Sequence, residues 1–357
     1  MKDKGISEEE LRSKVDPKVL SLEEKIHQRD ARIKILTNRV GELERFESEV
    51  FKSIMGLPKI RSLQPYKKGV VRKKTDHDVI LSLTDTHAEE FVSPEEMEGY
   101  AEYTWEIYKD RMWATGEELI KRVHEKRSQY KVSRLIVPLL GDMLTGIIHD
   151  ELDRTNTWTL PNAVVSTAYI LAQLLIKISA EFDEVLVEAC VGNHGREDKK
   201  PTSKQKVDRN WDYAVYIITR LLTVNNPKIK WNIPKSAAHI FKVQGATILQ
   251  KHGDNIRSTG IVPYYGISRD LAEEHEKRRD ADFDYCLMGH WHHYAVIKGH
   301  CIICPSMIGP SQYSFNRLHT VYPPEQVVMF STGDYGIVDF RKIDLTKARG
   351  NRFVDVI

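Results

Sequence analysis

Five short apolar runs in this sequence each end in residues of the kind that ligate metal ions. The first run, Val79-Ile80-Leu81, has the length and composition of a buried strand, and it leads into Asp85-Thr86-His87. The other four runs lead into Gly141-Asp142, Gly192-Asn193-His194, Lys251-His252-Gly253-Asp254 and Gly289-His290-Trp291-His292. We therefore expect the rest of the chain to be arranged so that these five loops meet.

The size and composition of the chain allow a large hydrophobic core. Its 357 residues are 41% hydrophobic, which suits one large α/β domain with an appendage. The formal net charge is +2, so the overall charge favours no class of partner. No apolar run approaches the ~18 residues that span a bilayer, and the N-terminus lacks the apolar segment of a signal peptide. These features predict a cytoplasmic protein without a membrane partner.

The four cysteines are expected to be buried thiols rather than disulfides. Cys190 and Cys286 fall inside predicted strands, where a thiol behaves as a small apolar side chain. Cys301 and Cys304 have the spacing of some zinc and redox sites. No second cysteine pair and no nearby histidine framework accompanies them, so a structural role is favoured.

Residues 1–56 have the pattern of a separate helical unit. Ser7 precedes three glutamates and is a plausible helix start. From Leu22 onward, apolar residues alternate at steps of four and three, with Arg29 and Glu47 filling two positions of the same series: Leu22, Ile26, Ile33, Leu36, Val40, Leu43 and Val50. This heptad seam predicts a coiled coil that makes the protein a homo-oligomer. The alternative, a helix packed on its own domain, would favour a broader apolar face.

Three segments follow the helical unit. Residues 57–77 form a basic linker, which either guides a nucleic-acid backbone or is simply solvated. Its charged residues are Lys59, Arg61, Lys67, Lys68, Arg72, Lys73 and Lys74, with Tyr66 among them. Residues 78–345 form the main domain, and residues 346–357 form a C-terminal tail.

The first part of the main domain alternates between strands and helices. Helices are predicted over residues 94–131, with Pro94 in the first turn, and over 161–181, 208–223 and 265–280. This alternation predicts parallel strand pairing. Consecutive strands after Gly289 predict an antiparallel part of the sheet.

The candidate ligands at the five strand ends are all oxygen or imidazole donors. They are Asp85, His87, Asp142, Asn193, His252, His290 and His292. Such a set suits Mn²⁺, Fe²⁺, Zn²⁺ or Mg²⁺, of which we favour Mn²⁺. Seven ligands are too many for one ion. Two ions about 3.5–4 Å apart that share a carboxylate are the usual arrangement for phosphate-ester hydrolysis, in which one ion helps to make hydroxide from water.

Taken together, the five motifs resemble the signature of the calcineurin-like metallophosphoesterase superfamily, nearest to its SbcD-type nuclease and phosphodiesterase branch. The resemblance covers residues from about 78 to 340. It implies an α/β fold in which two mixed sheets form a β-sandwich flanked by helices, with the long N-terminal helix outside it. It also implies that Asp142 bridges two metal ions, one held by Asp85, His87 and His292 and the other by Asn193, His252 and His290.

The resemblance also implies catalytic residues around these metals. His194 would face the substrate and protonate the leaving oxygen, a role that suits an imidazole. The family commonly has an acidic residue after Gly-Asn-His, whereas Gly195 and Arg196 follow here, so Glu197 or Asp198 would have to orient His194. Arg196 either clamps the phosphate or is a surface residue. His149 is a possible match to the second histidine of the SbcD type, at a longer spacing.

These features predict a nuclease or other phosphodiesterase that acts on nucleic acid, with DNA as the favoured partner. The family's phosphoprotein phosphatases continue Gly-Asp with Asp and Arg, and this chain has neither. Basic residues lie at 67–74 and 196–206, and three tryptophans near the site loops could stack bases: Trp158, Trp211 and Trp291. The alternatives are a phosphomonoesterase, a small-nucleotide phosphodiesterase, or a non-catalytic oligomeric scaffold with a vestigial metal site.

Overall fold

The chain divides into two compact units, Met1–Gly56 and Leu57–Ile357. A computed structural model describes residues 17–58, 76–256 and 263–356, with the exceptions of a few side chains. The described part of the first unit contains one continuous helix, α2 (Pro17–Met55). The helix start expected at Ser7 and the charged residues of the basic linker lie outside the described residues.

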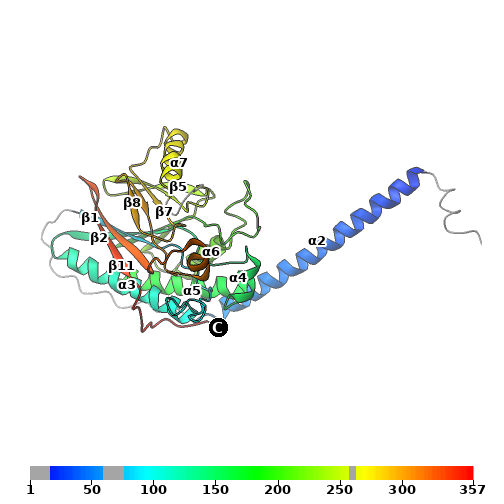
Figure 1. The fold of residues 1–357 in the computed structure, drawn as a ribbon, viewed down its shortest axis with the longest axis horizontal. Helices are drawn as coiled ribbons and strands as arrows, with labels where there is room; N and C mark the ends of the chain where they lie inside the picture. Colours follow the sequence, from blue (N-terminus) through cyan, green and yellow to red (C-terminus); the bar gives the residue numbers. More distant parts are fainter. Residues whose placement is uncertain (1–16, 59–75, 257–262, 357) are drawn as a thin grey trace, which may run out of the picture. The chain divides into compact units, whose positions relative to one another are not determined.

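The second unit is built on two mixed sheets, as the sequence predicts (Figure 1). The larger sheet has six strands in the order β11-β10-β1-β2-β3-β4. Their bounds are Gly336–Asp344, Glu325–Thr332, Asp76–Ser82, Lys131–Leu139, Glu184–Ala189 and Ile229–Asn232. The strands β1 to β4 pair in parallel, whereas β10 pairs antiparallel with both β1 and β11.

The second sheet has five strands in the order β5-β6-β7-β9-β8. Their bounds are Ala238–Val243, Ala246–Lys251, Tyr285–Met288, Cys301–Ile303 and Ala295–Ile297. The antiparallel pairing expected after Gly289 holds for β8–β9 and β10–β11, and β10 is also antiparallel to β1. It does not hold on the other side of β9, where β9 pairs in parallel with β7. The pair β7–β9 is parallel because the chain first forms β8, on the far side of β9, and then turns back to form β9.

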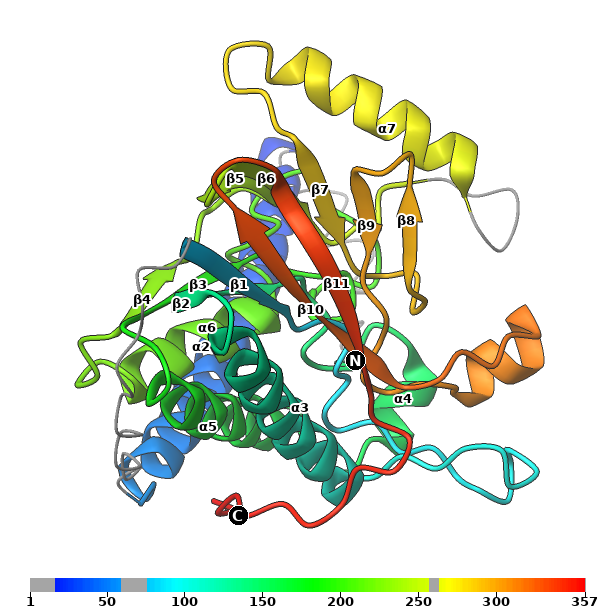
Figure 2. The ribbon, with the colours of Figure 1, turned by 90° about the vertical axis from the view of Figure 1, so that its left-hand side faces the viewer.

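The two sheets pack face to face, and alternate residues of the central strands of the five-stranded sheet divide between two apolar clusters. Ile248 and Ile302 point into the cluster between the sheets, where they meet Ile80 and Met329 of the larger sheet. Their neighbours Leu249 and Ile303, with the opposite side-chain direction, lie in a second cluster. That cluster also contains Ile267 and Leu271 of helix α7 (Tyr264–Lys277), which covers the outer face of the five-stranded sheet (Figure 2).

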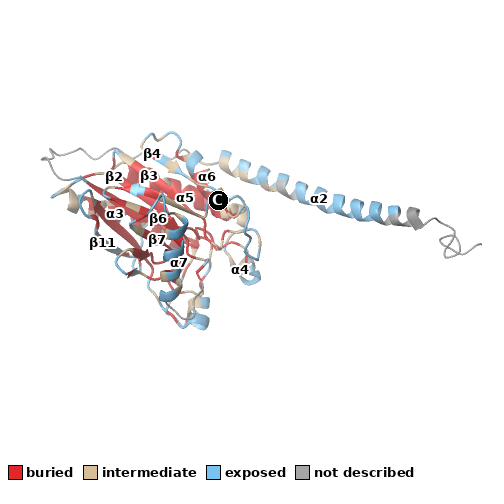
Figure 3. Cartoon of the chain, turned by 90° about the horizontal axis from the view of Figure 1, so that it is seen from above, coloured by how far each residue is buried: buried red, intermediate tan, exposed pale blue. Residues whose placement is uncertain are grey.

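Three helices pack along the other side of the sandwich. They are α3 (Trp105–Arg127), α5 (Leu160–Ser179) and α6 (Trp211–Leu222), and α5 contacts both of the others. Figure 3 shows the buried strands enclosed by these layers. Two short helical segments lie in loops: α4 (Asp150–Thr155) and a π-helical turn, η1 (Ser314–Leu318).

The helix expected over residues 94–131 begins eleven residues later than predicted. Thr104 is its N-cap, and its Oγ1 accepts a hydrogen bond from the N–H of Ile107 at 3.3 Å. Residues 93–100 form tight turns instead, held by a backbone pairing between Val92 and Tyr103. The start at Pro94 was therefore wrong, because a threonine with a free acceptor is the stronger helix-start signal.

Two further expectations can be compared with the structure. The four cysteines are buried free thiols, as predicted. Helix α5 is long and apolar enough to cross a membrane by length and composition, although no contiguous apolar run of the sequence indicated it. Most of its apolar window, 89%, is buried within the protein, which is the behaviour of a core helix.

The C-terminal tail packs on the domain, where Asp355 pairs with Lys109 and Asn351 bonds to Asp110.

The topology brings the five motif loops to one edge of the sandwich. Each motif follows the carboxyl end of a strand with parallel pairing, namely β1, β2, β3, β6 or β7. Buried Gln250 of β6 ties the two sheets at this edge, since its Nε2 donates to the carbonyls of Leu139 (2.6 Å) and Glu188 (3.0 Å). Buried Gln326 accepts from the N–H of Thr84 at 3.2 Å and so fixes the loop that carries Asp85.

Candidate metal centre

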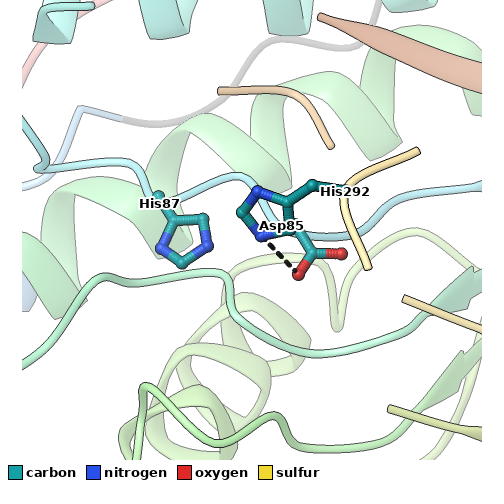
Figure 4. A group of neighbouring side chains, drawn as sticks. All are labelled: Asp85, His87 and His292. Atoms are coloured by element: carbon teal, nitrogen blue, oxygen red, sulfur yellow. Dashed lines mark ion pairs between the residues drawn. The ribbon is translucent and has the colours of Figure 1, made fainter. Parts of the chain in front are cut away.

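The first group of candidate ligands comes from the ends of β1 and β7. Asp85, His87 and His292 each offer a ligand atom, and these atoms lie within 4.8 Å of one another (Figure 4). His292 Nε2 is 3.3 Å from Asp85 Oδ1. Asp85 and His87 are almost fully buried, and His292 is partly exposed, so solvent reaches the group on the His292 side.

The second group comes from the ends of β2, β3, β6 and β7. Asp142, His252 and His290 form a second set of ligand atoms within 4.8 Å of one another. His252 Nε2 lies 2.9 Å from Asp142 Oδ2 and 3.1 Å from Asn193 Oδ1. The structure thus brings together all seven residues that the sequence singled out, in two groups.

Asp142 connects the two groups. It also forms a set of ligand atoms within 4.8 Å with His87, of the first group, and with His194. Its Oδ2 is the atom next to His252, and its Oδ1 accepts from the backbone N–H of His194 at 2.7 Å. A carboxylate this close to both groups is where a bridging ligand has to lie. The same proximity places His194 within reach of a metal, so its predicted role as a non-ligand stays a prediction.

The donor atoms fit divalent cations. His87 Nε2 is buried and has no hydrogen-bond partner among the described residues, while its Nδ1 lies 3.2 Å from Thr145 Oγ1. An unpaired buried nitrogen is costly unless an ion or water uses it. His252 Nδ1 donates to the carbonyl of Leu140 at 2.8 Å, which leaves Nε2 with its lone pair directed at the site. All donors are imidazole, carboxylate or amide oxygen, which suits two borderline cations.

Glycines keep the carboxylates accessible. A Cβ at Gly192 would lie 2.1 Å from Asp142 Oδ1, and a Cβ at Gly289 would lie 2.6 Å from Asp85 Oδ2. No side chain fits at that separation. The glycine in Gly-Asn-His and in Gly-His-x-His is therefore required by the close approach of another motif's carboxylate, and not by a turn alone.

The backbone of the site is held in an uncommon conformation. Nine non-glycine residues of the described chain have positive φ, and five of them are candidate ligands: Asp85 (48°), His87 (44°), Asp142 (51°), His290 (69°) and His292 (56°). Such residues are uncommon and cluster at functional sites, where the surrounding structure imposes them. These five residues lie in three of the five motif loops, which indicates that these loops are shaped for a purpose other than packing.

The pKa values of the site depend on close pairing between carboxylates and imidazoles. Burial acts to raise the pKa of Asp85, but His292 outweighs it and lowers that pKa to about 2. Burial acts to lower the pKa of His252, yet the Asp142 carboxylate raises it to about 10. Burial and the neighbouring His252 lower the pKa of His290 to about 4. A cation must displace the proton of His252, so metal binding weakens as the pH falls.

Asp212 is the residue of the site that sequence reasoning missed. Its carboxylate accepts hydrogen bonds from the backbone N–H groups of Asp142 (2.9 Å), Met143 (3.0 Å) and Gly192 (2.9 Å). It therefore holds the loops after β2 and β3 in one arrangement. Burial and the nearby Asp142 raise the pKa of Asp212 to about 7.

The sequence around Asp212 disguises this role. Asn210 is the N-cap of α6, and its Oδ1 accepts from the N–H of Asp212 at 2.9 Å. An acidic residue in the first turn of a helix is ordinary in its own right. The only signal available was that this acidic residue begins a helix shortly after Gly-Asn-His, which does not distinguish it from any other first-turn carboxylate.

The predicted catalytic residues differ in how they are placed. His194 Nδ1 lies 3.0 Å from the carbonyl of Thr145, so Nδ1 carries a proton and Nε2 is the nitrogen left for chemistry. Burial lowers the pKa of His194. His149 is exposed, and its ring centroid is 6.1 Å from that of His194. Arg196 donates to the carbonyls of Asp198 (3.1 Å) and Lys199 (3.4 Å), so two of its donors are used within its own loop.

The acidic residues expected to orient His194 have another partner. Glu197 and Asp198 both pair with Arg209, at 3.1 Å each. The carbonyl of Thr145 holds the His194 ring in their place. Among the tryptophans expected to stack bases, Trp291 packs against the outer core of the second sheet, and the ring centroid of Trp158 lies 6.0 Å from that of Trp105.

No protein family model matches the chain, and no curated protein sequence matches it. Among solved structures, the chain is similar to a predicted phosphoesterase from Streptococcus pneumoniae (11% identity, 75% of this chain and 98% of that one, TM-score 0.28). It is also similar to Vps29 complexed with Zn²⁺ from Entamoeba histolytica (13%, 75% and 99%, TM-score 0.27). A third is the purple acid phosphatase PPD1 from yellow lupin (10%, 79% and 55%, TM-score 0.33). Likeness at this level carries no function to this chain, so the chemistry of the site rests on the geometry of its own residues.

Asp142→Ala is expected to remove metal from both groups. Wild-type protein should bind about two divalent ions per chain, and the variant should retain fewer than one because the shared carboxylate is lost. Elemental analysis after dialysis against Mn²⁺ gives the stoichiometry. The control is Asp280→Ala, an exposed carboxylate outside the site. Undiminished metal in the Asp142 variant would contradict the bridging role.

Asp212→Asn is expected to weaken metal binding without touching a ligand. An amide can accept from the backbone N–H groups with its oxygen only, and its NH₂ group would face at least one of them. Loss of such a supporting contact typically lowers metal affinity ~10–100-fold. Calorimetric titration with Mn²⁺ measures the effect, with exposed Asp208→Asn as the matched control. Equal affinities in the two variants would show that the loops hold their positions without Asp212.

Proposed function

We propose that this chain is a metal-dependent phosphoesterase of the calcineurin-like type that hydrolyses phosphodiester bonds of nucleic acid, with Mn²⁺ as its ion and DNA as its favoured substrate. The observation that carries this proposal is the meeting of seven oxygen and imidazole donors in two groups, joined by Asp142. In a cluster with a purely structural role, each of these buried polar atoms would be hydrogen-bonded to another group of the protein. Here His87 Nε2 is left without a partner among the described residues.

Two bound divalent ions would lower the pKa of water and offset the negative charge of a phosphate in an in-line displacement. Asp85, His87 and His292 would hold one ion, and Asn193, His252 and His290 the other. The chain's own contribution is to hold these donors in place through Asp212, Thr145 and Leu140. Thr145 also donates to Glu90 at 3.0 Å, and so links the His87 ring to a buried carboxylate.

We propose that His194 acts on the leaving group. Its Nδ1 is fixed on the Thr145 carbonyl, so Nε2 is the nitrogen that can approach a substrate oxygen. Burial lowers its pKa and favours the neutral ring. A bound phosphate carries negative charge, which favours the imidazolium and restores the proton that a general acid needs.

Basic residues beside the site support a polyanionic substrate. Within the described loop that follows His194, Lys199 pairs with Asp150 and Lys206 pairs with Asp254. Lys200 and Lys204 are exposed in the same loop. Exposed lysines next to a phosphate-binding centre attract a nucleic-acid backbone without reading its sequence. These exposed lysines support a polymer as the substrate, because a polymer carries further phosphates that such side chains can meet.

Cleavage assays test the proposed substrate. Protein loaded with Mn²⁺ is expected to cut labelled single- or double-stranded DNA, and Asp142→Ala to lose this activity while Asp280→Ala keeps it. RNA and a panel of nucleotides are run in parallel. Hydrolysis of nucleotides or of nitrophenyl phosphate with no cut polymer would overturn the nuclease proposal and leave a phosphoesterase. Metal binding with no hydrolysis of any substrate would favour a scaffold.

His194→Ala is expected to keep near-normal metal content and to lose activity on nucleic acid. Loss of general acid catalysis lowers the rate ~10²–10⁴-fold. The loss should be much smaller for a nitrophenyl ester, because nitrophenolate leaves without protonation. Steady-state rates are measured on both substrates, and the metal content of the variant is measured beside them as a check on its folding. Equal losses on both would indicate charge stabilisation, and loss of metal would make His194 a ligand.

A further inference from the structure

Helix α2 is the largest part of the described chain that the proposed activity does not use. It is continuous over 39 residues, which corresponds to about 58 Å at 1.5 Å per residue. A helix of this length and polarity gains little stability from propensity alone, since most helical stability comes from packing an apolar face. The helix therefore needs a partner surface along its length.

Five apolar residues of α2 form one narrow exposed stripe. In the helical unit their exposed fractions lie between 52% and 57%: Leu22, Ile26, Ile33, Leu36 and Val40. They follow steps of four and three, so they keep to one side of the helix when it supercoils. Figure 3 colours most of the described part of α2 as exposed. A stripe of this width fits one other helix.

The residue types within the stripe favour a coiled coil of two parallel helices. If the positions are named by the heptad, Ile26, Ile33 and Val40 are the a residues. Leu22 and Leu36 are d residues. β-Branched side chains at a with leucine at d favour a parallel two-stranded coiled coil over trimers and tetramers.

The charges beside the stripe select a second copy of this chain in parallel. The g positions carry Lys25, Arg32 and Arg39, and the e positions carry Asp30 and Glu44. In a parallel pair a g residue faces the e residue five positions later in the other helix. Lys25 then faces Asp30 of the partner subunit and Arg39 faces Glu44 of the partner subunit, while Arg32 faces an uncharged threonine.

An antiparallel pair would place the same charges against one another. There g faces g and e faces e, so the basic side chains would meet basic ones and the acidic side chains acidic ones. Repulsion of this kind is how coiled coils exclude a wrong orientation. In the parallel, in-register pair Arg29 at d and Glu47 at a each face the same residue of the other helix, which costs stability at two levels of the seam. A shift by one heptad would instead bury each charge against an apolar residue.

We propose that α2 pairs with α2 of a second copy as a parallel, in-register, two-stranded coiled coil. Because both helices run in the same direction, both chains enter their second units at the same end of the coil. The protein would then present two metal centres to one polymer. Two linked sites on one strand raise the effective affinity without any new contact in either site.

The test uses the full chain, with light scattering for its mass in solution. Wild type is expected at twice the mass of one chain. The double variant Ile33→Glu and Leu36→Glu is expected at half the wild-type mass, because it places charges in the seam. The control is Ile35→Glu, an exposed isoleucine (66%) outside the seam, which should keep the dimer. Mn²⁺ content and nitrophenyl-ester hydrolysis confirm that each variant is folded.

Orientation is tested by a single cysteine at Leu22. In a parallel, in-register pair the two introduced thiols are adjacent, so oxidation of Leu22→Cys should link most chains, whereas Ile35→Cys should not link. A wild-type monomer, or a seam variant of unchanged mass, would overturn the proposed pairing. A dimer in which Leu22→Cys fails to link would overturn the parallel orientation.

Discussion

One buried carboxylate holds the centre of this protein in shape. Asp212 accepts three backbone N–H groups from the loops after β2 and β3, and these loops carry Asp142, Asn193 and His194. Without this contact, three buried donors would lack partners, each at a cost of ~1–3 kcal/mol. Since the Asp142 backbone is bonded directly, the position of the shared carboxylate follows from a residue on helix α6.

The site couples this framework to a dense set of charges. Asp85 and Asp142 carry lowered pKa values because charged imidazoles lie against them, although burial acts in the opposite direction. A divalent ion in the place of those protons would satisfy the same carboxylates more strongly. The positive φ angles at five candidate ligands fit such a centre, because the loops are bent to point donors inward. Local strain and buried charge are therefore both consistent with a centre organised around cations.

Much of this arrangement could be predicted from the sequence, for a physical reason. A motif at the end of a parallel strand has its position fixed by the sheet, so five strand-end motifs predict one site at one edge. What lies between the motifs could not be predicted. Asp212 resembles an ordinary first-turn acid, and Gln250 and Gln326 resemble strand residues until their carbonyl partners are known. The orientation of His194 by the Thr145 carbonyl leaves no trace in the sequence either, because any residue supplies a carbonyl.

Two ions that share Asp142 are the central feature of the proposed site, and anomalous scattering from crystals grown with Mn²⁺ tests it most directly. A shared carboxylate predicts two peaks about 3.5–4 Å apart with Asp142 between them. One peak should contact Asp85, His87 and His292, and the other Asn193, His252 and His290. A single peak, or two peaks that do not share Asp142, would contradict a dinuclear centre of this kind.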